Sequence, residues 1–465
     1  MCIRDSCYFT CTLGQATEIN KDRATPFRNI NEFIDQQAEA VPNLPAVGFA
    51  EIKENDTGDS RSHFFSFQDV HRGTSFSAQV LGRLLQQKNS PKTQKIVALL
   101  CPSCPEFLFA WLGLIRLGHG VLLLAPQCQP SAVAHLCSEC HVETLFVEKT
   151  YADLARRSAE VFAEVHKKQL ICLDLGFQTT SPEFLEALRE PFPKHLDSSA
   201  LDQSSIAYLH HTSGTSTGLP KPIPQSHGAA ICVLPRFKDA SHQATFTTTP
   251  LYHGGVADLF RAWTSNAMIW LFPGRGVPIT AKNILKCLDQ AAACNQQSNT
   301  PRVTYFASVP YVLQMLASDA KGLQALQSMD ITGVGGAALP PEVGDDLVTK
   351  GVNLISRFGS AECGFLMSSH RSYAADNEWQ YLRATHGSDA IAFEPRNDGL
   401  SELVVLPTWP HRVRRLLYCS FIALLLIIVR PSQTVRMART PPLTSSFPMP
   451  RSQMHGSTTP VRTHS

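Results

Sequence analysis

The sequence predicts an α/β fold with a mainly parallel β-sheet. Short apolar segments alternate with helical segments between residues 95 and 147, an order typical of β-α-β units. The chain has 465 residues, 43% hydrophobic and 17% charged, which is enough for a large core and two or more subdomains. A glycine- and threonine-rich segment at residues 212–218 follows an apolar strand, where open α/β sheets bind ligands.

The individual elements follow from the spacing of apolar residues. Helices are expected where apolar residues recur at helical spacing, and strands where short apolar runs end at turn residues. The predicted helices are 27–41, 68–85, 105–117, 130–140 and one from Pro310 through Leu316. The predicted strands are 46–49, 64–67, 95–100, 121–124, 144–147, 206–209 and 303–309. The strand at 206–209 would deliver the glycine-rich segment at its carboxyl end.

Composition excludes several classes of function. A net charge of +2 indicates neither a basic surface that binds nucleic acid nor a polybasic patch that binds a membrane surface. The 14 cysteines form no framework of a small secreted domain, so we expect reduced thiols in a cytoplasmic protein. Residues 1–22 begin with a hexamer like translated library sequence and contain no signal-peptide core. We expect them to be artefactual or disordered.

Two cysteine pairs have the C-x-x-C spacing. Cys101 and Cys104 form one pair, and Cys137 and Cys140, followed by His141, form the other. Together they could indicate a zinc site, and the second matches a c-type haem attachment site. Both pairs lie at the ends of apolar elements, where cysteine packs as a small apolar residue. We therefore expect packing and not metal or haem binding.

The segment after strand 206–209 combines hydroxyls, two glycines and a lysine. Glycines allow close approach of the backbone, amide and hydroxyl groups can surround phosphate oxygens, and a lysine adds positive charge. The spacing differs from the Walker loop. The alternative is an ordinary surface loop. The expected phosphate-binding residues are Thr212, Ser213, Gly214, Thr215, Ser216, Thr217, Gly218 and Lys221.

This segment resembles the phosphate loop of adenylate-forming enzymes, the superfamily of acyl-CoA synthetases, luciferases and peptide-synthetase adenylation domains. One extra residue lies between its two glycines, and Pro222 replaces the last glycine of the family pattern. The following residues 223–227 resemble those of fungal reductases related to nonribosomal peptide synthetases. Three further segments, 247–255, 331–340 and 353–364, resemble family motifs in family order.

The resemblance implies an ATP site with Mg²⁺. Glu362 would hold the metal, and Phe358 would stack on adenine. His253 would border the acyl pocket, and Lys221, Glu362 and His253 would be the catalytic residues. The family threonine is Ala361 here, which removes one hydroxyl contact to the nucleotide. The other expected nucleotide contacts are Gly335, Gly336, Ala337, Ala338, Gly359 and Ser360.

The resemblance also implies the fold: the large N-terminal subdomain of the adenylate-forming enzymes, with stacked, mainly parallel sheets and flanking helices. We assign residues 23–411 to this domain. The ribose-binding aspartate motif and the lid with its catalytic lysine have no counterpart in residues 412–465. Shifting the reading frame of 437–446 and 451–465 permits strings that resemble the missing motifs. We therefore expect this tail to reflect an unspliced intron and a frameshift.

The expected activity is activation of a small carboxylic acid with ATP to an acyl-adenylate and pyrophosphate. The acyl group would then pass to a pantetheine thiol, on CoA or on a carrier domain that precedes a reductase domain. We expect this chain to be a weakly active or inactive fragment. One alternative is a non-catalytic nucleotide-binding protein with a membrane anchor at 416–429, a run shorter than the about twenty residues that span a bilayer. Another is a complete synthetase with an unusual lid.

Overall fold

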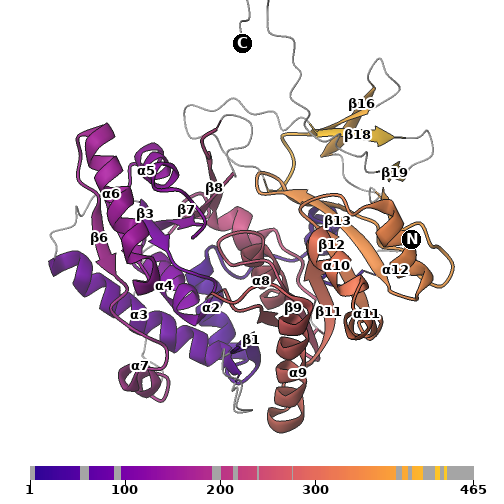
Figure 1. Cartoon of the computed structure of the whole chain (residues 1–465), viewed down its shortest axis with the longest axis horizontal. Coiled ribbons are helices and arrows are strands. Elements are labelled where there is room, and N and C mark those ends of the chain that lie inside the picture. Colours follow the sequence, from indigo (N-terminus) through magenta and orange to yellow (C-terminus); the bar gives the residue numbers. More distant parts are fainter. Residues whose placement is uncertain are drawn as a thin grey trace, which may run out of the picture.

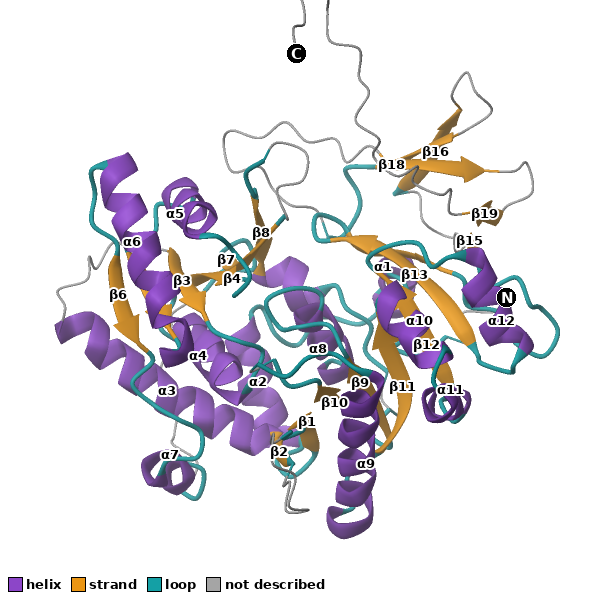
Figure 2. Ribbon diagram, viewed as in Figure 1, coloured by secondary structure: helices purple, strands orange, loops and turns teal. Residues whose placement is uncertain are grey.

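Two β-sheets organise the molecule, and each forms the centre of one lobe (Figure 1). The computed structural model gives only the backbone of residues 425–429 and 434–436. Otherwise it describes residues 6–52, 62–87, 96–190, 201–212, 218–237, 240–274, 276–383, 390–395 and 401–411. The two sheets contain six and thirteen strands among these residues. Helices cover the sheets, as Figure 2 shows, and this agrees with the predicted α/β class.

The smaller sheet has the strand order β6-β5-β3-β4-β7-β8 and is parallel except between β7 and β8. Its strands are β3 (Ile96–Leu100), β4 (Gly120–Leu124), β5 (Thr144–Val147), β6 (Ile171–Asp174), β7 (Ile206–His211) and β8 (Pro222–Ser226). All residues of β4 and β5 are buried, as expected for a parallel sheet covered on both faces.

Alternate residues of β3 and β4 pack against different helices. Leu100 and Leu124 join a core with α5 (Pro130–Glu139) and α6 (Ala152–His166). Leu99 and Leu123 join the largest core, together with α3 (Phe67–Gln87) and α4 (Pro105–Arg116). Because side chains alternate across a strand, these nearly continuous apolar runs fill both faces of the sheet.

The larger sheet has the order β16-β17-β18-β19-β15-β14-β13-β12-β11-β9-β10-β1-β2. Its central strands are parallel, and antiparallel strands extend it on both sides. The parallel part comprises β1 (Pro45–Phe49), β9 (Gln243–Thr247), β10 (Met268–Leu271), β11 (Arg302–Ser308), β12 (Ile331–Gly335) and β13 (Leu354–Ser360). The antiparallel strands are β2 (His63–Ser66), β14 (Gly364–Ser368), β15 (Tyr381–Arg383), β16 (Ile391–Pro395), β17 (Ser401–Val405), β18 (Leu425–Val429) and β19 (Thr434–Arg436).

The largest hydrophobic core lies between the two sheets. It contains α4 from the first lobe, and α8 (Gly255–Trp263) and residues of β10 and β11 from the second. On the other face of the larger sheet, Phe246, Trp270 and Phe306 belong to a separate core. That core is covered by α9 (Ala281–Ser298), α10 (Pro310–Ala317), α11 (Ala320–Gln327) and α12 (Pro341–Thr349).

The predicted elements occur in the structure within a few residues of their expected bounds. The helix predicted at 27–41 is α2 (Ile30–Ala40), and Asn29 caps its first turn by accepting a hydrogen bond from the amide of Glu32. The pattern predicted for 95–147 is the parallel core of the smaller sheet. Short isolated strands such as β6 and β10, and helix α9, were not predicted individually.

The N-terminal segment differs from the expectation of disorder. Among its described residues, Tyr8, Phe9, Cys11 and Leu13 are buried, and α1 (Leu13–Asn20) begins at a Thr12 cap. The physical reason is apolar burial, since two aromatic side chains and a leucine lie against the larger sheet. Residues 6–20 are therefore part of the fold that the structure describes.

The tail after residue 411 is described only as the backbone of β18 and β19, which pair antiparallel with each other. Strand β18 also pairs with β17, so part of the apolar run at 416–429 belongs to a sheet. None of the helices in the described part of the chain combines the length and apolarity that a membrane crossing requires. The four cysteines of the C-x-x-C pairs are all buried, with Cys101 and Cys104 sulfurs 3.8 Å apart.

Candidate nucleotide-binding site

Two hydrogen bonds close the base of the predicted phosphate loop, between the residue that follows β7 and the residue that precedes β8. The amide of Thr212 donates to the carbonyl of Lys221 at 3.0 Å, and the amide of Lys221 donates to Thr212 Oγ1 at 2.9 Å. Gly218 has φ of 77°, a conformation that suits glycine. Thr212, Gly218 and Lys221 therefore lie at the neck of the loop. The predicted contacts Ser213, Gly214, Thr215, Ser216 and Thr217 lie outside the described residues.

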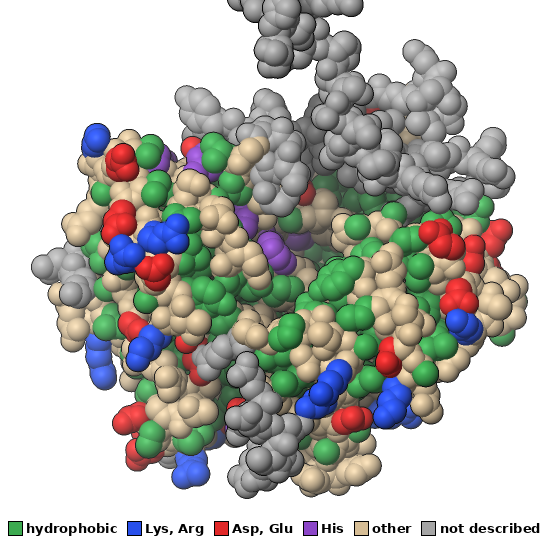
Figure 3. Space-filling model, viewed as in Figure 1, with side chains coloured by type: hydrophobic (Ala, Val, Ile, Leu, Met, Phe, Trp, Pro, Cys, Tyr) green, Lys and Arg blue, Asp and Glu red, His purple; other side chains and the backbone are tan. Residues whose placement is uncertain are grey.

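Three histidines surround the start of this loop. His210 and His211 are the last residues of β7, and the ring of His253 lies 5.7 Å from that of His211. Nδ1 of His210 faces the carbonyl oxygen of Tyr252 at 3.2 Å, and Nε2 of His211 accepts from the amide of Ala125. These contacts bring the segment around His253 to the phosphate loop. Figure 3 shows histidine side chains in the hollow between the two lobes.

Burial keeps these imidazoles neutral near pH 7. Desolvation, together with a smaller effect of the neighbouring His211, lowers the pKa of His253 to about 4. Desolvation also lowers the pKa of His210 to about 4. A neutral His253 can accept or donate a hydrogen bond without bringing a positive charge to the site.

The predicted adenine contacts come from adjacent parallel strands. Strands β12 and β13 pair so that Gly335 lies opposite Arg357, the residue before Phe358. A Cβ atom on Gly335 would lie 2.9 Å from the carbonyl oxygen of Arg357, so only glycine fits this approach. Gly336 has φ of 78° and turns the chain. The exposed residues Gly336, Ala337 and Ala338 and the half-buried Phe358 thus lie at the same edge of the sheet.

The segment that follows Phe358 is held by contacts from distant parts of the chain. Gln225 Nε2, on β8, donates to the carbonyl of Ala361 at 2.6 Å. Trp409 Nε1 donates to the carbonyl of Cys363 at 2.7 Å. Gln225 thus joins the phosphate-loop strand to the segment that carries Glu362. The sequence did not predict that Gln225 and Trp409 hold this segment, because no local sequence pattern reveals contacts between distant parts of the chain.

Glu362 has the chemistry of a Mg²⁺ ligand. Its carboxylate is half-buried, and no cation among the described residues lies within ion-pair distance of it. Carboxylate oxygens suit Mg²⁺, which commonly uses one or two protein carboxylates together with substrate phosphates and water. The described residues contain no group of three or more potential metal ligands. A single carboxylate on the segment that Gln225 joins to β8 is compatible with a metal held mainly by a nucleotide.

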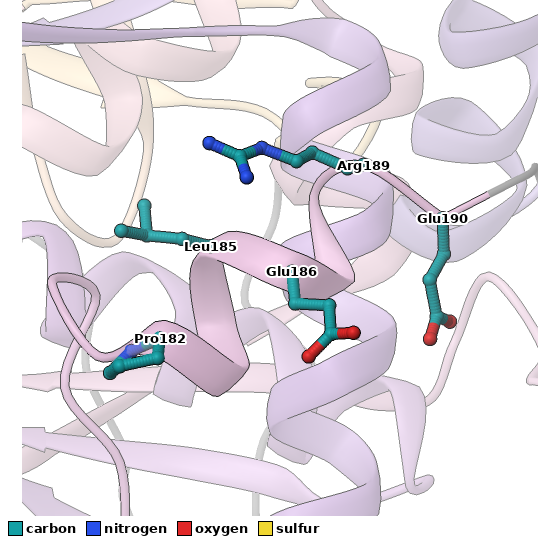
Figure 4. A pocket seen from close by; sticks show the side chains of 5 residues that line it. All are labelled: Pro182, Leu185, Glu186, Arg189 and Glu190. Carbon is teal, nitrogen blue, oxygen red and sulfur yellow. The ribbon is translucent and has the colours of Figure 1, made fainter.

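Helix α7 (Pro182–Ala187) lines a separate surface pocket, which Figure 4 shows from close by. None of the predicted site residues takes part in it. It is lined by Pro182, Leu185, Glu186, Arg189 and Glu190.

A comparison with protein families matches residues 34–387 to the family described as AMP-binding enzyme. The chain belongs to this family. AMP-binding enzymes form an acyl-adenylate from an acid and ATP, and they are ATP-dependent acid ligases and related adenylating enzymes. The match covers more than half of the chain and includes every predicted site residue.

Fungal members of the AMP-binding family resemble this chain in sequence. The adenylate-forming reductase stbB of Stachybotrys bisbyi is 29% identical over 302 residues, which cover 64% of this chain and 26% of the reductase. The adenylate-forming reductase Nps11 of Serpula lacrymans is 24% identical over 415 residues, covering 82% and 35% of the two chains. The chain thus spans about a quarter to a third of these relatives, which agrees with the expected fungal resemblance.

Solved structures of AMP-binding enzymes share the fold. The anthranilate CoA ligase AuaEII in complex with anthranoyl-AMP has a TM-score of 0.64 at 17% identity, covering 90% of this chain and 77% of the ligase. The o-succinylbenzoate CoA synthetase of Bacillus subtilis, in complex with the intermediate OSB-AMP, has a TM-score of 0.61 at 16% identity, covering 88% and 77%. The predicted fold is confirmed.

Proposed function

We propose that this chain carries the acid-adenylating site of a larger fungal enzyme. One observation carries the proposal: the hydrogen bond from Gln225 to Ala361 joins the strand of the phosphate loop to the segment of Phe358 and Glu362. This hydrogen bond holds three features together: the neck of a polyphosphate loop, the sheet edge proposed to contact a base, and a single carboxylate. This combination suits a nucleoside triphosphate with a divalent cation.

The residues would act mainly by positioning and charge. Lys221 and the backbone of the loop would hold the phosphates, while Phe358 and the turn at Gly336 would hold the base. The neutral His253 would border the acid and help to exclude water from it. The acid carboxylate would attack the α-phosphate, releasing pyrophosphate and leaving an acyl-adenylate. Glu362 would hold Mg²⁺, which would neutralise part of the phosphate charge.

We further propose that the acyl group passes to a pantetheine thiol. The fungal relatives named as adenylate-forming reductases support a carrier-bound thiol and a reductase domain as partners, in place of free CoA. Since residues 412–465 hold no counterpart of the ribose-binding aspartate or the lid lysine, nucleotide binding by this chain should be weak and turnover low.

The test is ATP–pyrophosphate exchange by the purified chain with a panel of carboxylic acids, beside a direct measurement of ATP binding. We expect measurable ATP binding that Glu362→Gln weakens only when Mg²⁺ is present, and exchange close to background. Exchange at the rate of a complete synthetase would contradict the fragment proposal. Absence of ATP binding at millimolar concentration would contradict the nucleotide site and, with it, the alternative of a nucleotide-binding pseudoenzyme.

The origin of the tail is a separate proposal, tested by sequencing the spliced transcript across the codons for 404–465. We expect codons between 413 and 430 to be absent and the frame to shift into the family motifs. A message that reads through as printed would contradict the intron and favour the pseudoenzyme anchored at 416–429.

A further inference from the structure

Residues 7–13 occupy a buried region beside the proposed nucleotide site, and we call this region the chamber. The ring of Phe9 stacks on Tyr305, with centroids 5.1 Å apart, and the guanidinium of Arg357 lies 4.5 Å from its centroid. The hydroxyl of Tyr8 forms a 2.8 Å hydrogen bond with Thr245 Oγ1. A Cβ atom on Gly333 would come within 2.8 Å of Phe9, so the glycine leaves room for the ring. The walls therefore come from β9, β11, β12 and β13.

The chamber contains two guanidinium groups and one carboxylate. Arg357 Nη1 lies 3.0 Å from Asp258 Oδ1, and both side chains are largely buried. Arg261, one turn along α8 from Asp258, is 4% exposed and donates to the main-chain carbonyls of Tyr8 and Cys11. Desolvation lowers the pKa of Arg261 to about 10, so it remains charged at neutral pH. Among the described residues, these three groups leave one net positive charge, and the carbonyls of Tyr8 and Cys11 and the ring of Phe365, 4.8 Å from the Arg261 guanidinium, stabilise it.

The chamber borders the proposed nucleotide contacts. Arg357 directly precedes Phe358, and Leu13 Cδ1 would lie 2.7 Å from a Cβ atom on Gly364, two residues after Glu362. Arg357 pairs with Asp258 on α8, the helix that carries Arg261, so a molecule that reaches Arg357 past Phe358 would also approach Arg261. Residues 7–13 contact both guanidinium groups in the structure.

We propose that this chamber receives the far end of the acid, that Arg261 and Arg357 select an acid with a second carboxylate, and that residues 7–13 compete for the same space. The inference rests on the proposed function. A second carboxylate would replace the carbonyl oxygens of Tyr8 and Cys11 and balance the unmatched guanidinium. An acid with an alkyl end would leave Arg261 buried without acceptors, which is costly.

The test compares adipate with hexanoate, two six-carbon acids that differ in the second carboxylate. Calorimetry on the full chain with saturating AMP should show adipate binding at least tenfold more tightly. Arg261→Gln should remove this preference by weakening the binding of adipate and not that of hexanoate. Equal affinities, or a preference unchanged in the variant, would overturn the inference. If AMP binds and the acids are not distinguished, the chamber proposal fails alone, whereas loss of AMP binding refutes the proposed function.

A second measurement uses the unmodified chain, in case Arg261→Gln does not fold. Amide hydrogen exchange of residues 7–13 should become faster with saturating adipate, because the acid displaces the segment, and should change little with hexanoate. If hydrogen exchange of residues 7–13 stays the same or slows with adipate, the acid does not displace the segment. That result would overturn the proposed competition for the chamber.

Discussion

Lys221 brings a positive charge to the neck of the phosphate loop, where its backbone pairs with Thr212. A charge-assisted contact to phosphate contributes about 1.5–3 kcal/mol. Lys221→Ala should therefore weaken ATP binding by about tenfold to a hundredfold, as measured by calorimetry. Lys350→Ala, which removes an exposed ion pair with Asp346 on α12, is the matched control and should leave ATP binding unchanged. Equal losses of ATP affinity in both variants would contradict the assignment of Lys221 as a phosphate contact.

Among the described residues, Asp258 is the carboxylate that forms an ion pair with Arg357. Asp258→Asn would leave this largely buried guanidinium uncompensated, at a cost of about 3 kcal/mol in the free energy of unfolding. Urea denaturation measures the loss. Asp346→Asn breaks the exposed pair with Lys350 and should cost less than about 1 kcal/mol.

Single residues differ in how well the sequence predicts them. Phe358 and Glu362 were predicted because a local pattern and a family resemblance mark them. Their roles stay predictions, and a hydrogen bond from Gln225 to Ala361 joins the segment that carries them to β8. Gln225 and Trp409 could not be predicted as fixing residues, because each acts through one hydrogen bond to a distant backbone carbonyl. Local periodicity carries no information on such pairs.

Among the secondary-structure elements, strands β13 and β14 hold the segment of Glu362 by a close backbone approach. A Cβ atom on Gly359 would lie 2.2 Å from the carbonyl oxygen of Gly364. Gly359→Ala should therefore force the two strands apart and lower the free energy of unfolding by more than about 2 kcal/mol. Gly351→Ala is the control, because its φ of 86° is strained for alanine but its Cβ position is open. It should cost about 1 kcal/mol. Similar losses in both variants would contradict a specific clash.

Strong apolar periodicity explains which elements were predicted. Strands β3, β4 and β5 are buried, continuous apolar runs, and the helices between them have clear apolar faces. The antiparallel strands near β15 are short and partly exposed, so their patterns are weak. The packing of residues 6–20 could not be predicted from sequence, because burial of Tyr8 and Phe9 depends on distant partners on β9 and β11.

At the scale of the whole molecule, buried histidines predict how stability depends on pH. Desolvation lowers the pKa of four histidines to about 4: His210, His227, His253 and His411. Their pKa in the unfolded chain is about 6.5, so the unfolded chain binds protons first as the pH falls. Stability should be constant above pH 7 and decrease between pH 6.5 and 4, by up to about 2 kcal/mol for each histidine at pH 5.

Urea denaturation at pH 7.5, 6 and 5 measures this dependence. His227→Gln should reduce its slope, since the imidazole accepts a hydrogen bond from the amide of Ile30 and glutamine keeps an acceptor without titrating. Stability that does not change between pH 7.5 and 5 would show that these imidazoles are not buried in the neutral form.

We propose that one nucleotide binds across the two sheets, between the phosphate-loop strand and the edge at Phe358. A crystal structure of the full chain with AMP and Mg²⁺ tests it most directly. We expect adenine between the turn at Gly336 and the ring of Phe358, with the phosphate toward Thr212 and Lys221. AMP bound elsewhere, or adenine that does not contact Phe358, would contradict it.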